Sequence, residues 1–289
     1  MTEELIPFGA EETEVCTYED CRVAILPIPY EGTVSYGGGT SKGPAALLEA
    51  SANLEYYDEE LDQDTCNIGI HTLPTVESAP TPAEMMDKIR EAASKPVKEG
   101  KFLCAIGGEH SVTRGVLDAL VESYGKDFGV LQLDAHADLR DKYDESPHSH
   151  ACIMRRVHDM GLPYAQTGIR SMSREEADFV KENKRKIFFA RDIQGETAWM
   201  DEILKSLPDK VFITIDIDCL DPSIMPSTGT PEPGGLDWHT TTAFLKKVAQ
   251  KKEVIGFDLV ELAPIEGLSA PDFLAAKLVY RLLGYIFKI

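Results

Sequence analysis

Residues 128–140 read FGVLQLDAHADLR, an apolar run that ends in acidic and imidazole side chains at alternate positions. A run of this length that is apolar at successive positions is typical of a strand buried on both faces of a parallel sheet. Successive strand residues point to opposite faces, so we expect Asp134, His136 and Asp138 to lie on one side of the chain. Burying these groups without partners would be costly. The stretch therefore predicts a central strand with a polar site at its end.

Similar apolar runs recur along the whole chain. They are RVAILPI (22–28), KFLCAIGG (101–108), YAQTGIR (164–170), KIFFARDI (186–193), VFITIDID (211–218) and EVIGFDLVEL (253–262). Segments with helical spacing lie between them or follow them, at residues 44–57, 82–99, 111–124, 151–160, 174–183, 196–207, 239–251 and 273–289. This alternation predicts an α/β protein, a three-layer α/β/α structure with a mainly parallel sheet. Because no linker divides the chain, we expect a single domain over residues 1–289, in which residues 1–21 form an N-terminal extension.

The composition is acidic, with 49 Asp and Glu against 29 Lys and Arg, for a formal net charge of -20. Such a surface repels nucleic acid and anionic membranes and attracts small cations, so we expect neither nucleic acid nor membrane as a partner. The last apolar run is interrupted by Lys277 and Arg281 and is too short to span a bilayer. The six cysteines lack a metal-ligand spacing and are expected to be reduced thiols. These features predict a cytoplasmic location.

Polar residues follow four of the predicted strands where each strand ends. The candidate metal ligands among them are His110, Asp134, His136, Asp138, Asp216 and Asp218. In parallel sheets the carboxyl ends of strands meet at one edge, where ligands bind. A single D-x-D more often caps a turn than binds a metal, but three motifs with complementary ligands favour a metal site. Four clustered carboxylates need positive charge, and their oxygen donors favour manganese, as two ions about 3.5–4 Å apart.

Seven motifs in this chain together resemble those of the ureohydrolases, the arginase and agmatinase family. They are SYGGGTSKGPAALLEAS (35–51), GGEHSVT (107–113), DAHADLR (134–140), SHA (149–151), DIDCLDPS (216–223), TGTPEPGG (228–235) and DLVELAP (258–264). The resemblance implies an arginase-like fold, assembly as a homotrimer or homohexamer, and hydrolysis of a guanidino group to urea and an amine. It also implies two manganese ions per chain. The first would be held by His110, Asp134, Asp138 and Asp216, and the second by Asp134, His136, Asp216 and Asp218.

The resemblance further implies roles for residues outside the metal ligands. Glu261 falls at the family position that binds the guanidinium, and Thr230 at a position that supports it. Asp138 would pass a proton to the leaving nitrogen, while His150 would contact the substrate and exchange protons with solvent. His148 remains an alternative for this proton exchange, since imidazole titrates near neutral pH.

The loop LRDKYDESPHSH (139–150) bears on the choice of substrate. In arginases the corresponding stretch is rich in Asn and Ser and binds the amino-acid head group. Here Asp144 and Glu145 make it acidic, which disfavours a substrate carboxylate and favours a second cation. We therefore expect attack of a metal-bridged hydroxide on agmatine, a small cationic guanidino substrate, to give putrescine and urea.

Several alternatives stay open. Aminopropylagmatine satisfies the same electrostatics as agmatine, whereas guanidinobutyrate does not, and the loop charges could simply face water. Other readings are a hydrolase of another guanidino compound, a non-catalytic regulatory homologue, and a deacetylase-like hydrolase with a single zinc ion.

Overall fold

The computed structural model describes residues 6–9 and 16–288 of the chain. Within these residues, eight strands form one sheet in the order β4-β1-β5-β10-β9-β6-β7-β8, and every neighbouring pair is parallel. The strands are β1 (Val23–Ile28), β4 (Ile70–Thr72), β5 (Phe102–Gly107), β6 (Gly129–Leu133), β7 (Tyr164–Ile169), β8 (Ile187–Phe189), β9 (Lys210–Asp216) and β10 (Glu253–Val260). The expected parallel sheet is confirmed.

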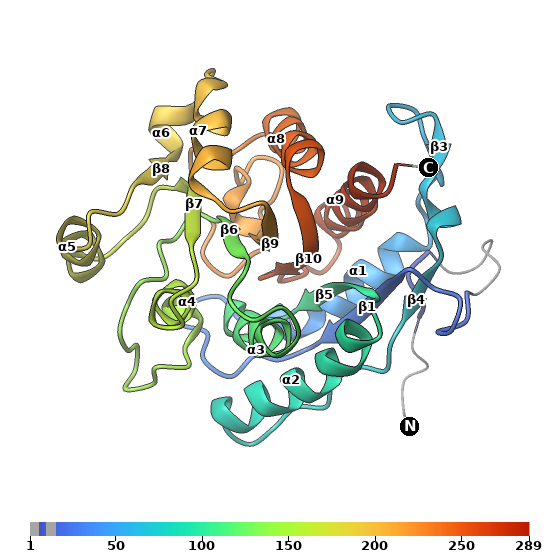
Figure 1. The fold of residues 1–289 in the computed structure, drawn as a ribbon, viewed down its shortest axis with the longest axis horizontal. Helices are drawn as coiled ribbons and strands as arrows, with labels where there is room; N and C mark the ends of the chain where they lie inside the picture. The colour runs from blue at the N-terminus through green and yellow to red at the C-terminus, as the bar shows by residue number, and fades with distance from the viewer. Residues whose placement is uncertain (1–5, 10–15, 289) are drawn as a thin grey trace.

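Helices cover both faces of this sheet (Figure 1). They are α1 (Gly43–Ser51), α2 (Pro82–Lys98), α3 (Thr113–Tyr124), α4 (Ile153–Asp159), α5 (Arg174–Glu182), α6 (Ala190–Ile193), α7 (Ala198–Ser206), α8 (Trp238–Lys251) and α9 (Ala270–Ile286). Helices α2, α3 and α4 lie on one face, and α1, α7, α8 and α9 lie on the other. The three-layer α/β/α architecture is therefore confirmed. No helix of the described ranges, 6–9 and 16–288, has the length and apolar character needed to cross a membrane.

Each face of the sheet has its own hydrophobic core, because neighbouring strand residues point to opposite sides. Val130 and Phe212 pack on the side of α2 and α3, whereas Leu131 and Ile213 pack on the side of α8 and α9. Strands buried on both faces explain why their sequences read as continuous apolar runs.

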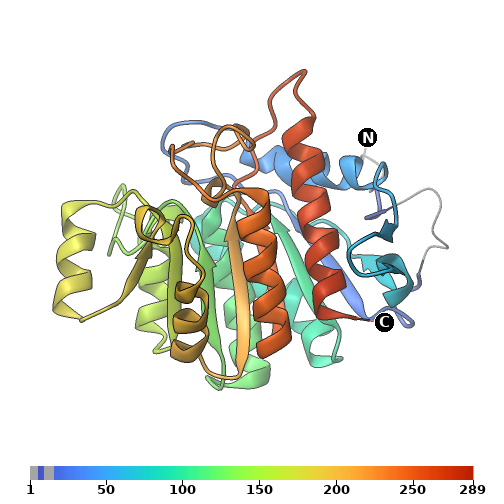
Figure 2. The ribbon, with the colours of Figure 1, turned by 90° about the horizontal axis from the view of Figure 1, so that it is seen from above.

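The strand order determines where the site forms. Strands β9 and β10 insert between β5 and β6, so that four central neighbours are β5, β10, β9 and β6. These are the strands whose ends carry His110, Glu261, Asp216 and Asp134. Loops that follow β1, β9 and β10 gather above this edge of the sheet (Figure 2).

Helix α1 is shorter than the helix expected over residues 44–57. It ends at Ser51, and the chain turns at Asn53, whose side-chain amide donates to the carbonyl of Glu49 at 3.2 Å. The following residues form a small antiparallel pair, β2 (Tyr57–Asp58) with β3 (Gln63–Asp64). Asn competes for local backbone hydrogen bonds and so favours helix ends, which explains the early stop.

The strand expected over residues 186–193 is also shorter in the structure. Strand β8 stops at Phe189, and Ala190–Ile193 form helix α6. Ala190 and Ile193 are buried while Arg191 and Asp192 between them are exposed. Buried positions three residues apart suit a helical turn, and two adjacent exposed residues do not suit strand alternation.

The β2–β3 region is tied to α9 by a buried arginine. Arg281 of α9 forms ion pairs with Asp58 at 2.7 Å, with Glu59 at 2.9 Å and with Glu60 at 2.5 Å. Asp58 is itself fully buried, so Arg281 supplies its compensating charge.

Candidate active site

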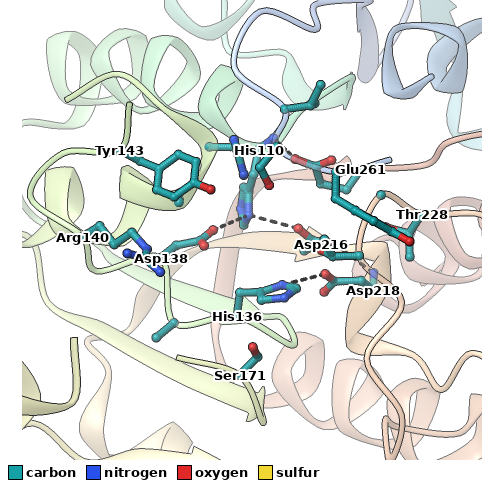
Figure 3. A pocket seen from close by; sticks show the side chains of 18 of the residues that line it. His110, His136, Asp138, Arg140, Tyr143, Ser171, Asp216, Asp218, Thr228 and Glu261 are labelled. Carbon is teal, nitrogen blue, oxygen red and sulfur yellow. Dashed lines mark hydrogen bonds and ion pairs between the residues drawn. The ribbon is translucent and has the colours of Figure 1, made fainter. Parts of the chain in front are cut away.

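A cavity of about 240 Å³ opens at the carboxyl edge of the central strands. Most of the predicted site residues line it, namely His110, His136, Asp138, His150, Asp216, Asp218, Thr230 and Glu261. Asp134 is fully buried and contacts both His110 and His136. The structure therefore brings together every predicted metal ligand, and Figure 3 shows most of them converging.

The alternation of polar residues in 134–138 suggested that strand β6 continues through this segment, but in the structure it does not. Strand β6 ends at Leu133, and Asp138 has a φ of 51°, a left-handed conformation that is uncommon for a residue with a side chain. The carbonyl of Asp138 accepts the backbone N–H groups of Met154 and Arg155 at 2.9 and 3.1 Å, which holds this turn against α4. Strained residues of this kind cluster at functional sites.

Hydrogen bonds from backbone N–H groups to carboxylates join residues 134–138 (DAHAD) to residues 216–218 (DID). The N–H of Ala135 donates to Asp218 at 2.9 Å, and the N–H of Asp218 donates to Asp216 at 2.9 Å. Ala135 and Ile217 are fully buried, as expected for residues that point into the core. These contacts fix the two acidic segments relative to each other.

The first ligand group consists of His110, Asp134 and Asp216, each of which offers an atom within 4.8 Å of the others. His110 Nδ1 lies 3.1 Å from Asp134, 3.2 Å from Asp138 and 3.4 Å from Asp216. This nitrogen is buried and has no hydrogen-bond partner within the part of the chain that the structure describes. The other ring nitrogen, Nε2, lies 2.8 Å from the Thr214 hydroxyl. A buried nitrogen that faces three carboxylates fits a metal ligand.

The second ligand group consists of Asp134, His136 and Asp218. His136 Nδ1 lies 2.8 Å from Asp218 and 3.7 Å from Asp134. Asp134 belongs to both groups, so one carboxylate can contact two ions. These residues therefore fit a pair of metal ions.

The electrostatics of the two groups favour added positive charge. Burial, together with Asp138 and Asp218, raises the pKa of Asp134 to about 7. Burial alone would lower the pKa of His136, but Asp218 and Asp134 outweigh it and raise the pKa to about 11. The cluster thus holds protons among its carboxylates where a divalent cation could replace them.

Glu261 follows β10 and is only 7% exposed, with a left-handed φ of 66°. Its carboxylate accepts the backbone N–H of His110 at 2.6 Å. Burial raises the pKa of Glu261 to about 8, against the opposing effect of that hydrogen bond. Thr230 lines the same cavity. A buried carboxylate beside the ligand groups can bind a cationic substrate.

His150 and its rival His148 lie in different places. His150 lines the cavity, and its ring packs edge-on against Tyr143 with 5.8 Å between centroids. His148 lies outside this cavity, beside Arg114 and Arg156, where burial and both arginines lower its pKa. This placement favours His150 as the residue that exchanges protons in the cavity.

Asp144 and Glu145 are both exposed, and neither is among the residues of the described ranges that line the cavity. Both have a left-handed φ, of 47° and 61°, so the loop turns sharply there. Their proposed contact with substrate stays a prediction, and the structure gives it no geometric support.

The structure adds residues that the sequence did not single out. Gln132 donates to Asp134 at 2.6 Å, and its presence inside the apolar run FGVLQL was a usable signal. Arg140 and Tyr143 line the cavity, with the guanidinium 5.1 Å from the ring centroid. Figure 3 shows these two residues on one side of the ligand groups and Glu261 with Thr228 on the other.

Comparison with known proteins agrees with this geometry. A family model described as "Arginase family" matches residues 21–284. The N(1)-aminopropylagmatine ureohydrolase of Synechocystis sp. is 45% identical, over 95% of this chain and 92% of its own length. The agmatinase of Pyrococcus horikoshii is 35% identical, over 92% of each chain. The crystal structure of the agmatine ureohydrolase of Thermoplasma volcanium matches with a TM-score of 0.88 and 29% identity, over 99% of this chain and 95% of that one. The chain therefore belongs to the arginase family of ureohydrolases.

Proposed function

We propose that this protein hydrolyses N(1)-aminopropylagmatine to urea and spermidine at a site that holds two manganese ions. The observation that supports the reaction is the pair of ligand groups sharing Asp134 beside the buried carboxylate of Glu261. The observation that supports the substrate is the Synechocystis relative, which is more similar to this chain than the Pyrococcus agmatinase is. Agmatine, the substrate expected from the sequence, becomes the second candidate.

The donors suit manganese better than a softer metal. His110, Asp134, Asp138 and Asp216 would hold one ion, and Asp134, His136, Asp216 and Asp218 would hold the other. In both ligand groups, carboxylate oxygens outnumber imidazole nitrogens, and neither group contains a cysteine among the described residues. This set of ligand atoms favours manganese over zinc. When bound, two such cations lower the pKa of a shared water, so that hydroxide is available near neutral pH.

The surrounding residues would bind and orient the guanidinium. The Glu261 carboxylate pairs with this cation through charge-assisted hydrogen bonds. Its burial excludes water, so the pairing is stronger than at the surface. The guanidino carbon is thereby held next to the ligand groups.

Proton transfer completes the reaction. Hydrolysis adds one water and breaks the bond between the guanidino carbon and the chain nitrogen, which must leave as a protonated amine. Asp138, at the edge of the first ligand group, would deliver this proton, and His150 would exchange protons with solvent.

By resemblance to the family, we also propose that the chain assembles as a homotrimer or homohexamer. Light scattering, which gives the mass of the particle in solution, tests this proposal.

Urea release from four compounds tests the proposal. The manganese-loaded protein is assayed with N(1)-aminopropylagmatine, agmatine, arginine and guanidinobutyrate. We expect the highest kcat/KM with N(1)-aminopropylagmatine and low values with the two carboxylates, because the protein carries a net charge of -20. A preference for arginine or guanidinobutyrate would refute the proposal that the substrate carries a cation and no carboxylate at the end opposite its guanidinium.

A further inference from the structure

Glu109 is fully buried beside the ligand groups but belongs to neither of them. Its carboxylate instead binds the loop that follows β1. It accepts the backbone N–H groups of Gly32 at 2.7 Å and Thr33 at 2.6 Å, and the hydroxyls of Thr33 at 2.7 Å and Ser111 at 2.5 Å. These contacts hold Thr33 in one position and one rotamer.

Thr33 links this carboxylate to His150. The Thr33 oxygen accepts the backbone N–H of His150 at 3.0 Å and lies 3.2 Å from the ring nitrogen Nδ1. A hydroxyl has one hydrogen to donate, and Thr33 donates it to Glu109. Toward His150 Nδ1 the Thr33 oxygen can therefore act only as an acceptor.

The Thr33 contact therefore requires a hydrogen on Nδ1. Ser149 Oγ, at 3.4 Å from Nδ1, can donate or accept, so the shorter contact of 3.2 Å to the Thr33 oxygen assigns the hydrogen. In a neutral imidazole with hydrogen on Nδ1, the other nitrogen, Nε2, has the free lone pair. His150 lines the cavity, so Nε2 is the atom left to exchange protons there.

We propose that Thr33, held by Glu109, is a positioning residue that fixes the His150 tautomer with hydrogen on Nδ1. The inference rests on the proposed function, because it assumes that His150 moves protons during guanidino hydrolysis. Thr33 itself touches neither substrate nor metal in this account. It acts only through the orientation and tautomer of His150.

The first test removes the Thr33 hydroxyl and keeps its shape. Thr33→Val should lower kcat by about 10- to 100-fold, a part of the usual contribution of general acid–base catalysis, and leave KM within about twofold. Thr33→Ser keeps the hydroxyl and should restore most of kcat. A matched control is Thr72→Val, which removes a buried hydroxyl that accepts the N–H of Phe8 at 2.9 Å outside the cavity, and it should leave kcat unchanged.

A double-mutant cycle separates positioning from a general structural role. In a His150→Ala background, Thr33→Val should cause no further loss of kcat, because the group it positions is gone. An equal loss in both backgrounds, a failure of Thr33→Ser to restore kcat, or a loss of bound manganese in Thr33→Val would overturn the inference.

A second measurement does not depend on turnover. Long-range ¹H–¹⁵N spectra of protein labelled with ¹⁵N-histidine, assigned with His150→Ala, report which ring nitrogen is protonated when the ring is neutral. We expect hydrogen on Nδ1 in the wild type and a mixture of tautomers in Thr33→Val. Hydrogen on Nε2 in the wild type would refute the inference. A wild type that releases no urea would instead refute the proposed function, while these spectra would still decide the tautomer.

Discussion

Replacing Glu261 with Gln isolates the charge that we assign to guanidinium binding. Gln has nearly the same shape, and its amide oxygen can still accept the His110 N–H that Glu261 accepts at 2.6 Å. The side chain is 7% exposed, so solvent would screen the lost interaction little, and the value for a buried pair applies rather than that for a surface pair. Breaking a buried pair costs about 3–5 kcal/mol, which corresponds to a loss of about 100- to 5,000-fold in kcat/KM.

The assay combines kcat/KM for urea release with the manganese content of the purified protein. Manganese content should stay at the wild-type level, because Glu261 belongs to neither ligand group. The exposed Glu266→Gln, in the loop that follows, is the matched control and should change neither quantity. A Glu261→Gln protein with kcat/KM within about threefold of wild type would refute the assigned role, and a loss of manganese would show that Glu261 acts through the metal site.

Three further predictions concern the metals and the fold. Asp134→Asn should remove manganese from both positions, because Asp134 belongs to both ligand groups, whereas Asp218→Asn should weaken one position only, and the metal content after dialysis distinguishes the two variants. Manganese affinity should rise with pH, because a bound ion must displace protons from His136, whose pKa is raised to about 11, and from Asp134, whose pKa is raised to about 7. The expected rise is about tenfold per pH unit for each proton displaced. Calorimetric titration that shows equal affinity at acidic and alkaline pH would contradict this prediction. Arg281→Met should destabilise the fold by about 3–5 kcal/mol, because the buried carboxylate of Asp58 loses its ion-pair partner. In thermal unfolding this corresponds to a decrease of about 6–20 °C in Tm, and adding Asp58→Asn should recover part of that decrease.

The long buried strands and the candidate metal ligands were predictable because each rests on a local pattern. The run ending in Asp134 shows the signature of a doubly covered strand, and its polar residues fall at a strand end, where parallel sheets bind ligands. What local pattern could not give is the strand order. The insertion of β9 and β10 between β5 and β6 depends on contacts between distant segments, yet it is what brings Asp216 and Glu261 next to Asp134.

Short elements and loop contacts were missed for a different reason. Strand β4 has three residues, too few for a periodic pattern. Strand β8 was extended because the apolar Ala190 and Ile193 follow the apolar run of Ile187–Phe189, although Arg191 and Asp192 lie between them. The charges of Asp144 and Glu145 were visible in the sequence, but the positive φ at both residues and their exposure to solvent were not. The link from Glu109 through Thr33 to His150 joins residues far apart in the chain and could be found only in three dimensions.

A competition assay tests the central claim most directly. The manganese-loaded protein is given equal concentrations of N(1)-aminopropylagmatine and agmatine, and spermidine and putrescine are measured in the same sample. Because the two substrates compete for one site, the ratio of initial product rates equals the ratio of their kcat/KM values. We predict that spermidine forms faster than putrescine and that the urea released equals the sum of the two amines. Faster formation of putrescine would contradict the proposed substrate, and the absence of both products and of urea would contradict the proposed reaction.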